Sequence, residues 1–305
     1  MPKYAGLYIG AFTLFVIGGG FLLHLTLAPK PVGTASAQVA CSVASAPRLE
    51  AQSAALFDIT KRTFLFQKNA DAQMPLASLT KLMTVLVASR ILDPASLVSV
   101  RAEALTPEGD SGLLAGELWE VQDLIDFTLI TSSNDGAHAL ALAASAQEQE
   151  PAQAFIARMN ALAGAFSLQQ TYFLNDTGLD VSPRTAGAYG SAEDIARLLL
   201  HIYEEEETVF SGSVKSEKTF VSASGVPHTA THTSAIAGVL SGEIVSKTGF
   251  TDLAGGNLAV VAEPGLGHPV VLVVLGSSKE GRDTDLQTLY DYAKKSLKRA
   301  TLCGI

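Results

Sequence analysis

Three short motifs in a fixed order constrain this chain more than any other feature of its sequence. They are S-L-T-K at residues 78–81, S-S-N at 132–134 and K-T-G at 247–249. Serine, threonine and lysine are common residues, so each motif alone is weak evidence. The ordered set is specific, because it describes a nucleophilic serine that works without a histidine base. A chain that uses the set has to fold so that three distant segments meet.

The first motif pairs a nucleophile with a candidate base. Residues 74–92 form an apolar run with helical period, and its polar start predicts a helix beginning at Ala77 or Ser78. Residues three apart share a helix face, so the Ser78 hydroxyl and the Lys81 amine can meet. A lysine with its ordinary pKa of about 10.4 is protonated and cannot act as a base. Burial or a second cation, for which Lys247 is the candidate, must therefore lower the pKa of Lys81.

The motifs and their surroundings resemble a known family. S-x-x-K, a second serine motif and K-T-G are found in penicillin-binding proteins and the related β-lactamases. Residues 73–88, 109–141, 171–180 and 245–262 are similar to the serine D-alanyl-D-alanine carboxypeptidases, which are the low-molecular-mass penicillin-binding proteins. The similarity runs from about Ala51 to about Ala300. It implies an enzyme that removes the terminal D-alanine from peptidoglycan stem peptides, and that β-lactam antibiotics inhibit covalently.

The resemblance also implies roles for individual residues. Ser78 would be acylated, Lys81 would take its proton, and Ser132 would relay a proton to the leaving D-alanine. Asn134 would position the substrate amide. Lys247 and Thr248 of the K-T-G motif, with Gly249, would bind the terminal carboxylate, and Arg282 would lie near it. The backbone N–H groups of Ser78 and Phe250 would form an oxyanion hole. For Arg282 the alternative is a cap on a surface helix. Neither a metal nor a cofactor is implied.

Two positions depart from the family pattern. Ser133 stands where the family usually has glycine, and residues 231–236, T-H-T-S-A-I, replace an Asn-Thr-Asn segment before K-T-G. Three alternative functions stay open on the same motifs: a DD-endopeptidase, a β-lactamase and an inactive relative that binds wall peptides. Class A β-lactamases activate the deacylating water with a glutamate, and Thr171 occupies that position here.

The amino-terminal region predicts export. Residues 4–27 contain no Asp, Glu, Lys or Arg and are long enough to cross a membrane, which favours a retained anchor within residues 1–29. The alternative is a signal peptide cleaved after the small residues at 34–37. Either way the domain lies outside the cytoplasm. Residues 30–50 are small, polar and interrupted by proline, which predicts a linker. Cys41 and Cys303 bracket the domain and form either a disulfide or two free thiols.

The remaining pattern predicts an α+β catalytic domain at residues 51–305. Residues 53–59 and 62–68 read as a hairpin, and 242–249, 255–263 and 268–276 read as strands. Residues 92 to about 207 are helical in pattern, and 283–300 form an amphipathic helix. The resemblance implies an antiparallel sheet flanked by helices, as in β-lactamases and DD-peptidases, with a mainly helical region inserted.

Composition and two histidines complete the sequence-based predictions. The net charge of −9 argues against nucleic-acid binding, so capture of an anionic peptide must rely on local cations such as Lys247. His228 and His232 have the spacing of zinc ligands on a helix but lie in a strand-like stretch. We therefore expect surface histidines there.

Overall fold

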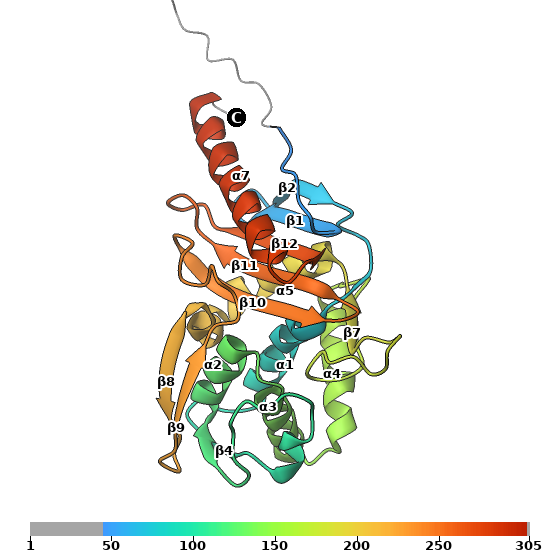
Figure 1. Cartoon of the computed structure of the whole chain (residues 1–305), viewed down its shortest axis with the longest axis vertical. Coiled ribbons are helices and arrows are strands. Elements are labelled where there is room, and N and C mark those ends of the chain that lie inside the picture. Colours follow the sequence, from blue (N-terminus) through green and yellow to red (C-terminus); the bar gives the residue numbers. More distant parts are fainter. Residues whose placement is uncertain (1–44, 304–305) are drawn as a thin grey trace, which may run out of the picture. The chain divides into compact units, whose positions relative to one another are not determined.

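The computed structural model describes residues 45–303, and its centre is a five-stranded antiparallel sheet (Figure 1). The strand order is β10-β11-β12-β1-β2. The strands are β1 (Ser53–Asp58), β2 (Thr63–Lys68), β10 (Glu243–Thr251), β11 (Gly255–Ala262) and β12 (Val270–Ser277). The predicted hairpin and the three later strands are thus confirmed. Strands from both ends of the chain meet where β1 pairs with β12.

Both faces of this sheet are covered, which explains its continuous apolar strands. In β12, Val271, Val273 and Leu275 enter one core cluster, whereas Val270, Leu272 and Val274 enter the other. Helix α7 (Gly281–Cys303), drawn in red in Figure 1, packs on β11 and β12 through the second cluster. Helix α5 (Ala192–Glu205) packs on β1 and β12 through the first. The predicted final helix is confirmed.

The segment between β2 and β10 is mainly helical, as predicted. Its helices are η1 (Ala77–Leu79), α1 (Thr80–Ser89), η2 (Ala102–Leu105), α2 (Val121–Thr131), α3 (Asn134–Gln147), α4 (Ala152–Ala165), α5, α6 (Glu207–Phe210) and η3 (Ser211–Val214). Short strands form three small sheets: β3 (Met74–Pro75) with β7 (Ala188–Gly190) and β6 (Tyr172–Phe173), β4 (Leu97–Ser99) with β5 (Leu118–Glu120), and β8 (Glu217–Val221) with β9 (Pro227–Thr231).

The start of the domain is tied to the start of α7. The buried Asp285 carboxylate accepts hydrogen bonds from the backbone N–H of Glu50 at 2.8 Å and of Ala51 at 2.7 Å. It also accepts the hydroxyl of Ser277, at the end of β12, at 2.7 Å. One carboxylate thereby connects the entry into β1, the exit from β12 and the helix that covers them.

Several predictions concern residues that lie outside this description. The predicted membrane segment at 1–29, most of the linker at 30–50 and Cys41 all precede residue 45. Within residues 45–303, no helix combines the length and the apolar character that a membrane span requires.

Candidate active site

The start of α1 brings Ser78 and Lys81 together. Ser78 lies in η1, which continues directly into α1, so the predicted helix start is confirmed. The Lys81 Nζ lies 2.9 Å from the Ser78 Oγ and donates to two further oxygens. These are the Asn134 Oδ1 and the backbone oxygen of Thr177, both at 2.7 Å. Lys81 is fully buried, whereas Ser78 is partly exposed.

This arrangement suits an unprotonated amine. Burial lowers the pKa of Lys81 to about 7, although the Asp176 carboxylate opposes the shift. A neutral amine has two N–H bonds and one lone pair. If the two N–H bonds point to Asn134 and Thr177, the lone pair faces the Ser78 hydroxyl. Of the two causes predicted from the sequence, burial or a second cation, burial is the one that lowers the pKa of Lys81.

The backbone around the nucleophile is unusual. Ala77, directly before Ser78, has φ 48°, a conformation that costs a non-glycine residue energy. Gly178 follows Thr177 and lies so close that an added Cβ would be 1.9 Å from the Ala77 carbonyl oxygen. Only glycine fits there, and this close approach delivers the Thr177 carbonyl to Lys81.

The second motif lies at the junction of α2 and α3. Ser132 ends α2 in the left-handed conformation, φ 61°, and its Oγ accepts a hydrogen bond of 2.8 Å from the Lys247 Nζ. Ser133 caps α3 by accepting the Gly136 N–H at 2.9 Å. The Ser133 Oγ also lies 2.7 Å from the Ser111 Oγ. The serine that replaces the usual glycine therefore joins the loop at 109–112 to the start of α3.

The third motif lies on β10, an edge strand of the sheet. Lys247 is fully buried, and burial, Lys81 and Arg282 together lower its pKa. Gly249 approaches η1 so closely that an added Cβ would be 2.8 Å from the Leu76 carbonyl oxygen and 3.2 Å from the Ser78 nitrogen. Strand β10 can thus lie beside the nucleophile because residue 249 has no side chain.

Arg282 belongs to the same site. Its guanidinium donates to the carbonyl oxygens of Gly249 at 3.0 Å and Thr233 at 2.7 Å, and the residue is only 4% exposed. The alternative of a surface helix cap is therefore wrong. Thr233 also contacts Thr248 through their hydroxyl groups. The unusual segment at 231–236 is thus joined directly to K-T-G.

These residues surround one pocket of about 370 Å³. Its lining residues are Ser78, Ser132, Thr233, Thr248, Gly249, Phe250, Lys279 and Arg282. Of the nine residues singled out from the sequence, six line this pocket, and Lys81 and Lys247 bond to the lining residues Ser78 and Ser132. Asn134 is one step further away, because it bonds to Lys81. No sequence signal pointed to Thr177, because its backbone carbonyl makes the contact with Lys81. Thr233 and Lys279 were likewise missed, since neither belongs to a motif.

The two histidines contradict the surface prediction. His228 is 9% exposed, and its Nε2 lies 2.6 Å from the Glu117 carboxylate. His232 is 8% exposed, and burial together with the charge of Lys247 lowers its pKa to about 4. The prediction of surface histidines is wrong, because His228 lies on the buried side of β9 and His232, directly after that strand, is buried as well. No group of three His, Cys, Asp or Glu side chains within residues 45–303 is arranged to hold a metal ion.

Comparison with known proteins decides the family. The sequence profile described as D-alanyl-D-alanine carboxypeptidase matches residues 40–279. The chain belongs to this family. The family prediction made from the three motifs is therefore confirmed, and with it the prediction of a serine hydrolase.

Individual proteins similar to this chain carry names that agree with the family. The carboxypeptidase DacD of Salmonella typhimurium is 27% identical over 93% of the chain and 71% of the relative. DacF of Bacillus subtilis is 28% identical over 80% of the chain and 62% of the relative, so the chain spans less than two thirds of it. Penicillin-binding protein D2 of Listeria monocytogenes, solved with cefotaxime bound, covers 81% of the chain and 98% of its own length, with 27% identity and a TM-score of 0.68. The predicted DD-peptidase fold is confirmed.

Proposed function

We propose that this protein is a serine carboxypeptidase that removes the terminal D-alanine from peptidoglycan stem peptides ending in D-alanyl-D-alanine. The observation that carries the proposal is the 2.9 Å contact between the Ser78 Oγ and the Nζ of a buried Lys81. A lysine whose pKa is about 7 is partly unprotonated at neutral pH and can act as a general base. Family membership supplies the substrate class.

Acylation follows from this geometry. The Lys81 amine takes the proton of the Ser78 hydroxyl while Oγ attacks the carbonyl carbon of the last peptide bond. Backbone N–H groups of Ser78 and Phe250 stabilise the oxyanion. As the tetrahedral intermediate collapses, Ser132 passes a proton to the leaving D-alanine nitrogen, and Lys247 can restore that proton because it donates to the Ser132 Oγ at 2.8 Å. Water then hydrolyses the Ser78 ester with the same groups in reverse roles.

Substrate binding uses cations within an acidic protein. The chain carries a net charge of −9, so long-range attraction does not favour a peptide carboxylate. Lys247 and Arg282 are both buried beside the pocket, and Thr248 and Gly249 line it. We assign the terminal carboxylate to this group. Asn134, which holds Lys81 through its Oδ1, would position the substrate amide.

A β-lactamase is the closest enzymatic alternative. Thr171, at the position where class A enzymes carry their water-activating glutamate, is buried and donates to the Asp194 carboxylate at 2.8 Å. A threonine cannot ionise to drive water onto the penicilloyl ester. The penicillin leaving group also stays tethered and shields that ester, whereas D-alanine departs. We therefore expect penicillin to inactivate the enzyme for minutes or longer.

The test combines labelling with product analysis. Wild-type protein should bind fluorescent penicillin covalently and release D-alanine from a peptide ending in D-alanyl-D-alanine, with or without a chelator. Ser78→Ala should do neither, while Ser211→Ala, at an exposed serine in η3, should behave as wild type. Labelling without release of D-alanine, but with cleavage of cross-linked muropeptides, would indicate the endopeptidase. If fluorescent penicillin fails to label the wild-type protein, the chain is an inactive relative that binds wall peptides.

We also propose that the protein is held in the bacterial cell membrane by its amino-terminal segment, with the catalytic domain outside the cytoplasm. The uncharged stretch at residues 4–27 supports this location. Full-length protein should stay in the membrane pellet after a carbonate wash and retain its original amino terminus. A soluble exported protein that begins near residue 38 would mean that the segment is a cleaved signal peptide.

A further inference from the structure

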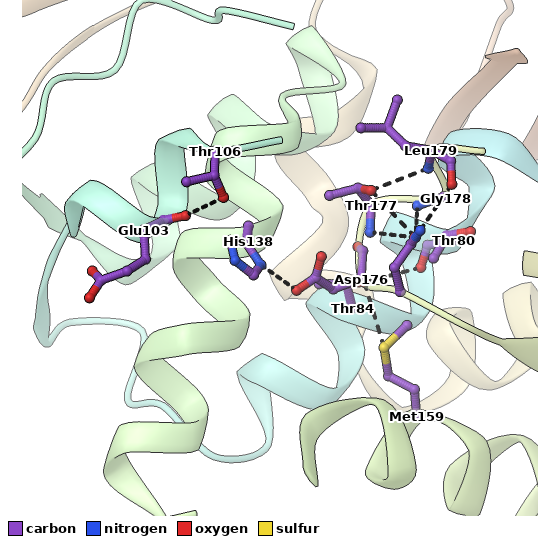
Figure 2. Close-up of polar contacts among 11 residues, drawn as sticks. Thr80, Thr84, Glu103, Thr106, His138, Met159, Asp176, Thr177, Gly178 and Leu179 are labelled. Carbon is purple, nitrogen blue, oxygen red and sulfur yellow. Dashed lines mark hydrogen bonds and ion pairs between the residues drawn. The ribbon is translucent and has the colours of Figure 1, made fainter. Parts of the chain in front are cut away.

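A histidine and a carboxylate lie behind the lysine base. Figure 2 shows His138 on α3 directed at Asp176, with its Nδ1 2.7 Å from the Asp176 Oδ2. The two side chains are 24% and 10% exposed. Neither residue belongs to a motif, and the acylation steps above use neither. A buried carboxylate needs a partner, and His138 supplies a hydrogen bond to this one.

The pair joins the two segments that hold Lys81. His138 lies one turn after Asn134 on α3, and Asn134 accepts a hydrogen bond from the Lys81 Nζ. Asp176 directly precedes Thr177, whose carbonyl accepts another. The Asp176 backbone oxygen in turn accepts the Thr84 hydroxyl at 2.6 Å, from the turn of α1 after Lys81. The His138–Asp176 contact therefore closes a ring around the base.

We propose that His138 and Asp176 are positioning residues for Lys81: Asp176 is its counter-charge, and protonated His138 cancels that charge so that Lys81 can release its proton. This inference rests on the proposed function, because it assigns Lys81 the role of base. It deepens that function by adding an electrostatic influence of His138, on α3, on the protonation of Lys81.

The electrostatic directions agree with this arrangement. Asp176 raises the pKa of Lys81 against the effect of burial. The hydrogen bond to Asp176 raises the pKa of His138 above its usual 6.5. His138 is therefore charged over part of the range in which Lys81 titrates. A cation on His138 weakens the attraction between Asp176 and the Lys81 proton.

Other charged groups near the ring are few. Asp135, next to Asn134 on α3, also raises the pKa of His138. Lys247 on β10 faces Lys81 from the far side of the site. Glu103 on η2, also drawn in Figure 2, is exposed and pairs with Arg101. On α4, Arg158 is paired with Glu148 and Glu150. The variants below leave all of these groups unchanged.

The test measures the rate of acylation by fluorescent penicillin as a function of pH. His138→Asn keeps a donor near the position of Nδ1 but removes the positive charge, so Asp176 is left uncancelled. The pH at which acylation is half lost on the acid side should rise by about one unit. Asp176→Asn keeps an acceptor and removes the negative charge, so this pH should fall by a smaller amount.

The double variant distinguishes charge from structure. In an Asp176→Asn background there is no carboxylate charge for His138 to cancel. Adding His138→Asn should therefore not shift the acid limb, which is the fall in acylation rate on the acid side of the pH profile. Thr84→Val is the matched control, since it breaks the bond to the Asp176 backbone without changing a charge. It should slow acylation at every pH and leave the position of the acid limb in place.

Two outcomes would overturn the inference while the proposed function stands. Acid limbs that coincide in wild type, His138→Asn and Asp176→Asn would mean that the pair does not tune Lys81. Equal shifts from His138→Asn in the two backgrounds would mean that it acts independently of Asp176. Loss of labelling in the wild type itself would instead contradict the proposed function. Thermal unfolding of each variant shows whether the domain is still folded.

Discussion

At the scale of single residues, Lys81 combines a charge-bearing side chain with complete burial. A fully buried ammonium group loses its hydration, which costs several kcal/mol unless the group is paired or neutral. Here the cost appears as a pKa of about 7 and is offset by hydrogen bonds to Asn134 and Thr177. A lysine, which is ordinarily protonated at neutral pH, is thereby partly unprotonated there, as the proposed role of a base requires.

The lowered pKa of Lys81 predicts how acylation depends on pH. Because the folded-state pKa of Lys81 is about 7, the amine gains its proton as the pH falls through 7, and acylation by fluorescent penicillin should fall with it. Lys81→Met has no proton acceptor and should lose roughly 10²–10⁴-fold in rate, with no acid limb in the remaining activity. Lys61→Met, at an exposed lysine, is the control. An unchanged acid limb in Lys81→Met would assign the titration to another group.

At the scale of elements, the contact between β10 and η1 places an edge strand of the sheet beside Ser78. An edge strand has backbone groups free to pair with an extended peptide. Gly249 is the point of closest approach, because its Cα faces the Leu76 carbonyl and the Ser78 nitrogen. A small change of side chain there separates two elements that have to act together.

Gly249→Ala should therefore reduce activity far more than stability. The new Cβ would be 2.8 Å from the Leu76 carbonyl oxygen, so β10 has to move away from η1. We expect acylation to slow roughly 10²-fold, as small misplacements in active sites do. Gly164→Ala, on α4 with no atom within 4 Å of the added Cβ, should instead add up to about 1 kcal/mol to the free energy of unfolding. Equal acylation rates in the two variants would show that the close approach is unimportant.

At the scale of the whole molecule, the sheet depends on joining the two ends of the domain. Strands β1 and β2 precede the helical region and β10 to β12 follow it, so the sheet is complete only when β1 pairs with β12. Asp285 holds this junction through the N–H groups of Glu50 and Ala51 and the hydroxyl of Ser277. Asp285 itself does not line the pocket, although Arg282, one turn earlier on α7, does.

Asp285→Ala should destabilise the domain without a specific effect on chemistry. The change leaves three donors without their acceptor, two of them buried, which should lower the free energy of unfolding by roughly 3 kcal/mol in urea titrations. Folded variant should still be acylated at the wild-type rate. Asp291→Ala, at an exposed position on the same helix, should stay within about 0.5 kcal/mol of wild type. If Asp285→Ala lowers the free energy of unfolding no more than Asp291→Ala does, the junction is held mainly by the pairing of β1 with β12.

The sequence determined the helical pairing at the first motif and the main strands of the sheet, which depend on neighbours a few residues apart. The contact of Ser78 with Lys81 follows from helical spacing, and the strands at 243–251, 255–262 and 270–277 follow from apolar runs between turns. The three motifs also identified the family, because their order is specific even though each is short.

Only the tertiary structure decided what surrounds these residues. Spacing cannot show that Thr177 offers its carbonyl to Lys81, that His138 meets Asp176, or that Arg282 and His232 are buried. Each of these depends on how segments tens of residues apart pack against one another. The same packing removes water from Lys81 and so lowers its pKa. The residue types of the site are local information, but their chemistry is set by burial, which is a property of the whole fold.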